Sequence, residues 1–107
     1  GRTKPDSIEL EDELMPENSH VSRSDVKIDG VAQKLYRRSV PYGGVLEHGL
    51  YFLAFSCDIR RFDRILQSMF GVSGDGIYDH LTDFSTPVSG NYWFAPSAAE
   101  LSAIGSL

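Results

Sequence analysis

The stretch "HVSRSDVKI", residues 20–28, alternates between two sets of side chains with an imperfect period of two. Such alternation is typical of a half-buried β-strand. The dipeptide Asp29-Gly30 follows, and it is a strong signal for a hairpin turn because both positions tolerate positive φ. The pattern therefore predicts a strand over 20–28 that turns back into a second strand, "KLYRRSV", which Pro41 ends.

The length of the turn sets the register of this hairpin. If the loop has two residues, the residues that flank it pair, and counting back places Ser22 opposite Arg37 and His20 near Ser39. A bulge or a longer loop in "VAQ" gives a different pairing, so the register stays open at this point.

The second half of the chain adds one strand and helices. "GLYFLAFS", residues 49–56, is a continuous apolar run that predicts a central strand. "DIRRFDRILQSMFG" predicts a helix with Asp58 as N-cap, one apolar face and Gly71 as its stop. A turn and a short helical piece follow in "GDGIYDHLTDFS", then a strand in "GNYWFAPS" and a helix starting at Ser97. This order predicts an α+β fold, an antiparallel sheet with helices on one face.

The first twenty residues, "GRTKPDSIELEDELMPENSH", are acidic, punctuated by proline and without periodicity. A structureless segment of this length is unusual in a compact domain, so it reads as a functional or inter-domain loop. We expect residues 1–20 to be a loop that enters from a missing N-terminal half. Residues 21–107 then form the domain, and the chain is expected to be a fragment or one chain of a cleaved protein.

Composition excludes several classes of protein. The 107 residues fit one domain, and the net charge of −5 argues against non-specific nucleic-acid binding, which needs clustered Lys and Arg. No apolar run approaches the roughly 18 residues that suggest a membrane span. The single cysteine, Cys57, rules out an internal disulfide and a thiolate-rich metal site; a buried, inert thiol is its default.

His20 is the first candidate for chemistry. Neutral imidazole is a common metal ligand, and it needs its other nitrogen held by an acceptor. The alternative is an ordinary capping histidine at a strand end. His48 and His80 show no zinc-like spacing with it. A lone histidine fits haem better, because one axial protein ligand is enough there.

Three charged residues extend this set. Arg37 and Arg38 are neighbours, so on a strand they face opposite sides, and one of them can point into a pocket. An arginine there can stabilise an oxyanion or clamp a carboxylate, whereas the alternative is a pair of solvated side chains. Asp79 can accept a hydrogen bond from a ligating histidine, or it can simply cap a helix. The aromatic triplet at 92–94 is expected in a core or an interface.

Taken in order, the motifs resemble one family closely. "GRTKPDSIEL", "PENSHV", "YRRSVPYG", "HGLYFLAFS", "MFG" and "DHLTDFSTPVSGNYWFAPS" are similar to the C-terminal half of the dye-decolourising peroxidases, in particular their shorter bacterial subgroup. The resemblance covers essentially the whole chain. It implies haem b as cofactor and two ferredoxin-like halves, of which this chain is the second half of a dimeric α+β barrel.

The resemblance also implies a role for individual residues. His20 matches the proximal iron ligand, and Asp79 matches the carboxylate that holds its imidazole. Arg37 matches the distal arginine that assists peroxide cleavage, with Ser39 beside it on the distal side. The remaining positions are Arg2 near the haem propionates and Leu50 and Phe52 lining the distal pocket.

This assignment constrains the hairpin. Cross-strand neighbours lie about 5 Å apart, yet the resemblance places His20 and Arg37 on opposite faces of the haem. Tight pairing down to His20 leaves no room for a macrocycle. We therefore expect His20 to lie in the loop before the strand rather than in the hairpin itself.

One family motif is absent. The distal aspartate of these peroxidases lies in a GxxDG motif in the N-terminal half, and no GxxDG occurs here. The expected function is a haem peroxidase that uses H₂O₂ to oxidise dyes, phenols or similar reductants, with this chain incomplete by itself. The alternatives are a haem-handling protein without peroxidase turnover and a ferredoxin-like interaction module without haem.

The resemblance sets the expected partners as well. They are the N-terminal half of the same protein, H₂O₂ and small-molecule reductants, with no nucleic acid and no membrane. A homo-oligomer and a cytoplasmic location are expected.

Overall fold

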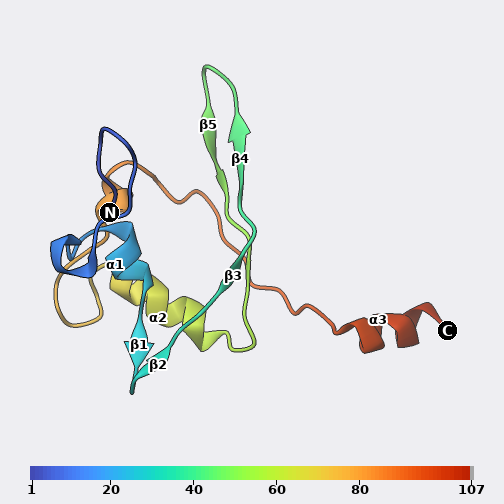
Figure 1. The fold of residues 1–107 in the computed structure, drawn as a ribbon. Coiled ribbons are helices and arrows are strands. Elements are labelled where there is room, and N and C mark those ends of the chain that lie inside the picture. Colours follow the sequence, from blue (N-terminus) through green and yellow to red (C-terminus); the bar gives the residue numbers. More distant parts are fainter. Residues whose placement is uncertain (107) are drawn as a thin grey trace.

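The computed structural model describes residues 1–106. Figure 1 shows short helices and short strand pairs linked by long extended segments. The elements in chain order are η1 (Asp12–Leu14), α1 (His20–Ser24), β1 (Lys27–Ile28), β2 (Val31–Ala32), β3 (Tyr36–Arg37), β4 (Val40–Gly43), β5 (His48–Tyr51), β6 (Ala54–Phe55), α2 (Arg60–Met69), η2 (His80–Asp83) and α3 (Ala98–Gly105).

The predicted hairpin turn is present. Ile28 pairs with Val31 across Asp29 and Gly30, whose φ angles are 50° and 77°. Two consecutive positive φ angles are the requirement of a type I′ turn, whose twist matches that of the flanking strands. The dipeptide therefore fixed both the position and the length of the turn, although the paired strands are only two residues long.

The strand predicted over 20–28 is wrong in its first half, because residues 20–24 form α1. Ser19 is the N-cap, and its hydroxyl accepts a hydrogen bond from the backbone N–H of Ser22. This cap satisfies one of the free N–H groups of the first turn, and five residues are too few for periodicity to outweigh it. The pairing of Ser22 with Arg37 is wrong too, since Arg37 pairs with Ala54.

Residues 36–43 and 48–55 form one ribbon, which we call the β3–β6/β4–β5 ribbon. Both halves keep the same antiparallel register, with Arg37 opposite Ala54 and Pro41 opposite Leu50. Pro41 therefore lies inside β4 and does not end the strand. A two-stranded ribbon consists of edge strands only, where a missing N–H is tolerated.

The single strand predicted over 49–56 is interrupted, and two shorter strands, β5 and β6, take its place. The backbone N–H of Arg38 donates to the carbonyl of Leu53 at 2.8 Å, as the register requires. The N–H of Leu53, however, donates to the Ser39 hydroxyl at 3.4 Å. A serine hydroxyl that competes with the backbone in this way breaks a ladder locally, which explains the gap between β5 and β6.

The helix predicted after Asp58 is confirmed. α2 begins one residue later than an Asp58 cap implies, with Ile59 in the cap position, but the Asp58 carboxylate still accepts from the Arg60 N–H at 3.0 Å. Ile65 faces inward from α2 and is buried. Gly71 follows the helix with a φ of 71°, which is the left-handed stop that the sequence indicated.

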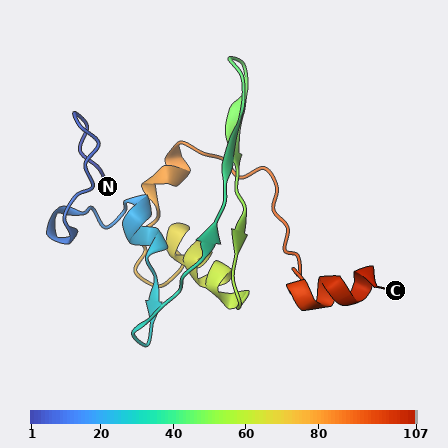
Figure 2. The same cartoon turned by 45° about the vertical axis from the view of Figure 1, so that its right-hand side comes forward.

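The end of the chain differs from the prediction in one element. Residues 90–97 form no strand and run as an extended segment, in which Tyr92 packs edge-on against Phe62 at 5.8 Å. α3 follows with a complete capping box between Ser97 and Glu100, as a helix starting at Ser97 predicts. Figures 1 and 2 both show α3 standing apart from the other elements.

The described residues enclose very little core. Ile65 is the only apolar side chain among them that is buried, beside four buried polar ones, Ser19, Gln33, Ser68 and Asp79. The radius of gyration is 17.1 Å, against roughly 13 Å for a compact domain of this length. The α+β class with antiparallel pairing is confirmed, but within residues 1–106 the strands form three two-stranded pairs instead of one sheet. None of the helices in this range combines the length and apolar character needed to span a bilayer.

Candidate functional site

The best-defined polar feature is a histidine–carboxylate pair. His20 Nδ1 lies 2.6 Å from Asp79 Oδ2, although 59 residues separate the two along the chain. An ionised carboxylate only accepts, so Nδ1–H donates and the lone pair of a neutral imidazole is left on Nε2. The His20 side chain is 40% exposed, whereas the Asp79 side chain is 0% exposed. In this pair, Asp79 is thus shielded from solvent, and His20 is partly accessible.

Asp79 is held from several sides. Its Oδ1 accepts from the N–H of Leu81 at 2.9 Å, which makes Asp79 the N-cap of η2. Its own N–H donates to the Met69 carbonyl at the end of α2 at 2.7 Å, and its carbonyl accepts from the Thr82 hydroxyl at 2.8 Å. Both carboxylate oxygens have a partner, so burial leaves none of this group's acceptor atoms without a hydrogen bond.

His20 is oriented by the start of α1. The buried Ser19 caps the helix, and the N–H of His80 donates to the carbonyl of Asn18 at 2.8 Å. His20 lies outside the hairpin, as the space for a macrocycle demanded, but it is the first residue of a helix rather than part of a loop.

This arrangement suits a metal that needs one protein ligand. Nowhere in the described part of the chain do three or more His, Cys, Asp or Glu side chains gather closely enough to hold an ion by themselves. An imidazole whose Nδ1–H is fixed by a carboxylate has the tautomer and orientation of a metal-ligating histidine. The pair therefore fits a metal whose other ligands belong to a cofactor.

The ribbon gathers most of the other expected site residues. Its common register places Ser39 opposite Phe52, two residues from the Arg37–Ala54 pair and two from the Pro41–Leu50 pair. Directly opposed residues share a face, and so do residues two apart on a strand. The register is the same on both sides of the gap between β5 and β6. With side chains alternating across that gap, one side of the ribbon carries Arg37, Ser39, Leu50 and Phe52. Leu50 and Phe52 are 59% and 55% exposed.

The two neighbouring arginines differ in their contacts. The Arg38 guanidinium lies 4.0 Å from the centre of the Tyr36 ring and donates to the Tyr36 hydroxyl. Within residues 1–106, no hydrogen bond or ion pair occupies the Arg37 side chain. Arg37 is thus the arginine with its donors available for a ligand.

Arg2 lies in a loop of its own. Its backbone forms an isolated antiparallel β-bridge with that of Glu9, and its side chain donates to the Ser7 hydroxyl at 3.1 Å. Neither this loop nor the ribbon is joined to the His20–Asp79 pair by a hydrogen bond within the described residues. The structure therefore shows one tight pair, one ribbon face and one separate loop.

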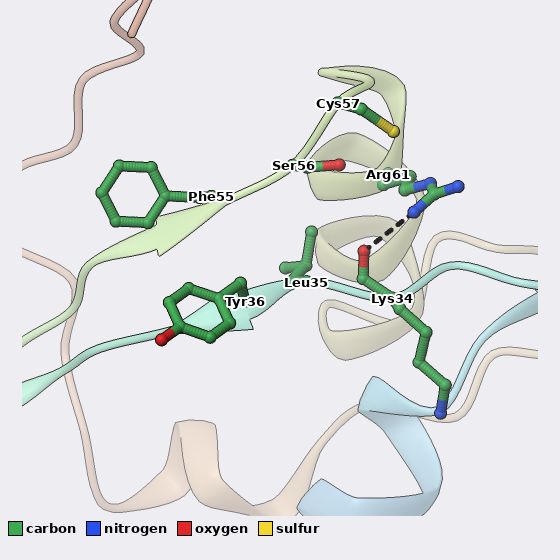
Figure 3. A pocket seen from close by; sticks show the side chains of 7 residues that line it. All are labelled: Lys34, Leu35, Tyr36, Phe55, Ser56, Cys57 and Arg61. Atoms are coloured by element: carbon green, nitrogen blue, oxygen red, sulfur yellow. Dashed lines mark hydrogen bonds between the residues drawn. The ribbon is translucent and has the colours of Figure 1, made fainter. Parts of the chain in front are cut away.

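A hollow in the surface is lined by none of the site residues that the sequence predicted. Figure 3 shows it between β3, β6 and the start of α2, with the Arg61 guanidinium donating to the Lys34 carbonyl at 3.2 Å. Cys57 lies at its edge and is exposed, so the expectation of a buried thiol is wrong. The reason is that Cys57 lies in the bend before α2 and not in the apolar strand that precedes it.

The sequence reasoning missed Arg23. Its guanidinium donates to Asp75 Oδ2 at 2.8 Å and to the carbonyl of Ile77 at 2.9 Å. The signal was present, because Arg23 lies three residues after His20 and shares a helix face with it once residues 20–24 are helical. Predicting a strand there concealed this relation.

Comparison with known proteins decides the family. The model of the C-terminal part of Dyp-type peroxidases matches residues 1–100. The chain belongs to the Dyp-type peroxidase family. Among curated members, the dye-decolorizing peroxidase of Mycobacterium tuberculosis is 39% identical over 100 residues, and that of Mycolicibacterium paratuberculosis is 37% identical over 100 residues. Both comparisons cover 91% of this chain but only 30% and 28% of the relatives, so the chain spans less than a third of their length.

Solved structures of family members agree with this assignment. A Dyp-type peroxidase protein from Shewanella oneidensis matches with a TM-score of 0.69 at 39% identity, over 78% of this chain and 27% of that one. The encapsulated Dyp-type peroxidase from Mycobacterium smegmatis gives 0.73 at 35% identity, over 83% and 30%. A variant of DypB from Rhodococcus jostii RHA1, solved in complex with heme, gives 0.68 at 34% identity, over 78% and 28%. The ferredoxin-like α+β fold expected for the chain is confirmed by these matches.

Proposed function

We propose that the chain supplies the haem-ligating part of a peroxidase that uses H₂O₂ to oxidise dyes, phenols or similar reductants. The observation that carries this proposal is the His20–Asp79 pair, which fixes a histidine by a buried carboxylate and leaves its other nitrogen accessible. The family membership supports the same activity for the whole protein.

The residues present fit haem b. A haem brings four nitrogen ligands of its own and, when bound, supplies the redox-active iron that reacts with peroxide. His20 Nε2 would be the protein ligand, because Asp79 already holds Nδ1. The buried carboxylate keeps the proton on Nδ1 and makes the imidazole a stronger electron donor.

The ribbon face would form the second wall of the site. Arg37 has the charge to stabilise negative charge as bound peroxide loses its proton, and within the described residues its side chain has no competing partner. Ser39 accepts from Leu53 N–H, and its own O–H is still able to donate toward a ligand. Leu50 and Phe52 on the same face would exclude water from this wall.

Arg2 is proposed to bind a haem propionate. A guanidinium matches a carboxylate with two parallel hydrogen bonds, which makes arginine well suited to this role. Its present partners are the loop residues Ser7 and Glu9, both at the surface. Binding a propionate would exchange these exposed contacts for a charged one.

We propose that the rest of the protein covers this chain. The chain spans under a third of its curated relatives, and its described residues bury one apolar side chain. The distal proton acceptor would then come from the covering part. A homo-oligomer and the cytoplasm stay our predictions for assembly and compartment; mass measurement of the intact protein tests the first and fractionation of cells the second.

The experiment is the His20→Ala variant of the whole protein. We expect it to lose the five-coordinate, histidine-ligated ferric haem signal in absorption and electron paramagnetic resonance spectra. His48→Ala is the matched control, because His48 pairs with Gly43 near the tip of the ribbon and has no carboxylate partner among the described residues. A His20→Ala protein with an unchanged Soret band and histidine signal would overturn the assignment.

A further inference from the structure

Two segments far apart in sequence run alongside each other at the candidate site. Residues 18–23 enter and form α1, and residues 75–80 lead from α2 into η2. Three sets of hydrogen bonds, here called ties, join the two segments, which run antiparallel to each other. The ties are the His80 N–H to the Asn18 carbonyl at 2.8 Å, the His20 imidazole to Asp79 at 2.6 Å, and the Arg23 guanidinium to Asp75 and the Ile77 carbonyl at 2.8 and 2.9 Å.

Of these three contacts, the one furthest from the Asn18–His80 hydrogen bond is made by Arg23, whose side chain is largely buried. The Arg23 side chain is 13% exposed, although its partner Asp75 is 42% exposed. Its Nε atom is buried and has no hydrogen-bond partner within the described residues. Burying a guanidinium with one donor unsatisfied costs free energy, so this side chain is a poor choice if its only role is stability.

Asp75 is organised to receive this arginine. Its carboxylate also accepts from the backbone N–H of Ile77 at 3.0 Å, which closes a tight turn. This backbone hydrogen bond is the main reason that the pKa of Asp75 lies below its usual value, and Arg23 lowers it further. The turn therefore presents a fixed anion and a fixed carbonyl to one guanidinium, and both accept from the same nitrogen, Nη1, which has two N–H groups to donate.

The position of Asp79 depends on this segment. α1 has five residues and no buried side chain, and a helix that short is not stable without tertiary contacts. Arg23 is in its last turn, so a tie there fixes the direction of the helix that begins at His20. Without this contact, the remaining hydrogen bonds between the two segments would all lie at the start of α1, and the imidazole could rotate away from the carboxylate.

We propose that Arg23 is a positioning residue that aligns the Asp79 carboxylate with His20 Nδ1. Arg23 itself touches neither the imidazole nor Asp79 by any hydrogen bond among the described residues. It acts through Asp75 and Ile77. The proposed ligand role of His20 is needed only for the haem-based readout below; the alignment of His20 with Asp79 is testable without it.

The test compares four variants of the whole protein. Arg23→Gln removes the charge and leaves two N–H donors in place of five, Arg23→Lys keeps the charge without the planar guanidinium, and Asp75→Asn keeps the side-chain volume of the partner. Arg60→Gln is the control, because Arg60 forms a local ion pair with Asp58 at 2.9 Å on the exposed side of α2. It has the same chemistry and no link to residues 75–80.

Two readouts separate positioning from general stability. In the haem-free protein, the ¹⁵N-labelled imidazole of His20 reports the Nδ1–H hydrogen bond by its chemical shift and its exchange with solvent. In the haem-loaded protein, the Fe(III)/Fe(II) potential reports electron donation by the ligand. Loss of a direct partner of a ligating histidine typically changes metal affinity by about 10–100-fold. Arg23 acts one contact further out, so we expect Arg23→Gln to weaken haem affinity by no more than about tenfold.

We expect Arg23→Gln to raise the exchange rate of the His20 Nδ1 proton and to move the potential in the same direction as Asp79→Asn. Asp75→Asn should give a smaller change of the same sign, and Arg23→Lys should recover part of the effect. If Arg23→Gln and Asp75→Asn fold normally and match Arg60→Gln in both readouts, the proposal is wrong. If haem is not ligated by His20, the potential will not respond to Asp79→Asn, while the Nδ1 exchange still tests Arg23.

Discussion

At the level of single residues, the candidate site combines a buried acceptor with an exposed ligand. Asp79 has no exposed surface, and its two oxygens bind His20 and the start of η2. Burying a carboxylate is costly unless it is fully hydrogen-bonded, which is the case here. The same bonds that make burial tolerable also fix the direction in which His20 points.

Asp79→Asn is expected to change the electronic properties of bound iron more than the amount of haem bound. Without the carboxylate the imidazole is a weaker donor, so the Fe(III)/Fe(II) potential should rise. Spectroelectrochemistry of the whole protein measures it. The control is Asp83→Asn, because Asp83 forms an exposed pair with His80 at 2.7 Å. An unchanged or lowered potential in Asp79→Asn would contradict the role of this carboxylate.

Arg37→Leu is expected to leave haem bound while slowing the reaction with H₂O₂. Removing one preorganised donor of this kind costs roughly 2.7–4 kcal/mol, or about 10²–10³ in rate. Stopped-flow absorbance after mixing with H₂O₂ measures the rate. Arg38→Leu should be near neutral in this assay, because Arg38 is occupied by the Tyr36 ring and hydroxyl. The reverse result, a slow Arg38 variant and a normal Arg37 variant, would mean that the ribbon presents its other face.

The site was predictable in part. The contact between His20 and Asp79 is present as the family resemblance implied, yet no local pattern could place residues 59 positions apart side by side. Arg23 was missed because its role depends on the helical phase of α1, which the alternation of "HVSRS" did not reveal. The roles of Arg37 and Ser39 stay predictions, because the ribbon face that carries them would face a ligand and not another part of this chain. The role of Arg2, in its separate loop, stays a prediction too.

At the level of elements, local signals succeeded where the chemistry of one or two residues decides the backbone. Asp29-Gly30 specified its turn, and Ser97 with Glu100 specified the start of α3. Prediction failed where tertiary contacts decide, as at α1, or where a side chain interferes with a ladder, as Ser39 does at Leu53. Residues 90–97 have strand-like composition but no strand neighbour within the described chain, so composition alone could not make them a strand.

Gly71→Ala tests the end of α2. Gly71 has a φ of 71°, and a Cβ there would lie 3.2 Å from the Tyr78 Cβ in the segment that leads to Asp79. The left-handed conformation costs an L-residue roughly 1–2 kcal/mol, so we expect a loss of stability of about that size. Chemical denaturation of the whole protein measures it. Gly44→Ala is the control, because a Cβ at Gly44 meets nothing within 4 Å. Equal stability of the two variants would show that the α2 stop does not depend on glycine.

At the level of the whole molecule, the chain has the surface of a part rather than of a self-sufficient domain. Its radius of gyration of 17.1 Å and its single buried apolar side chain leave large residues uncovered on the ribbon and along 85–97. Trp93 and Phe94 are 87% and 82% exposed, although aromatic residues of this size normally contribute most to a core or an interface. The structure places neither Trp93 nor Phe94 in a core, and an interface for them stays a prediction.

Hydrogen exchange in the 107-residue chain and in the whole protein tests whether the remaining protein covers this surface. A two-stranded ribbon is marginally stable by itself, so the amides of Val40, Tyr42, Gly43 and His48–Tyr51 should exchange rapidly in the isolated chain. If the rest of the protein packs on the ribbon, those amides should slow by at least about tenfold, which corresponds to about 1.4 kcal/mol of added protection. The comparison is internal, because α3 stands apart from the other elements and its amides should change less. Equal protection of the ribbon in both forms would show that its exposed residues are not an internal interface.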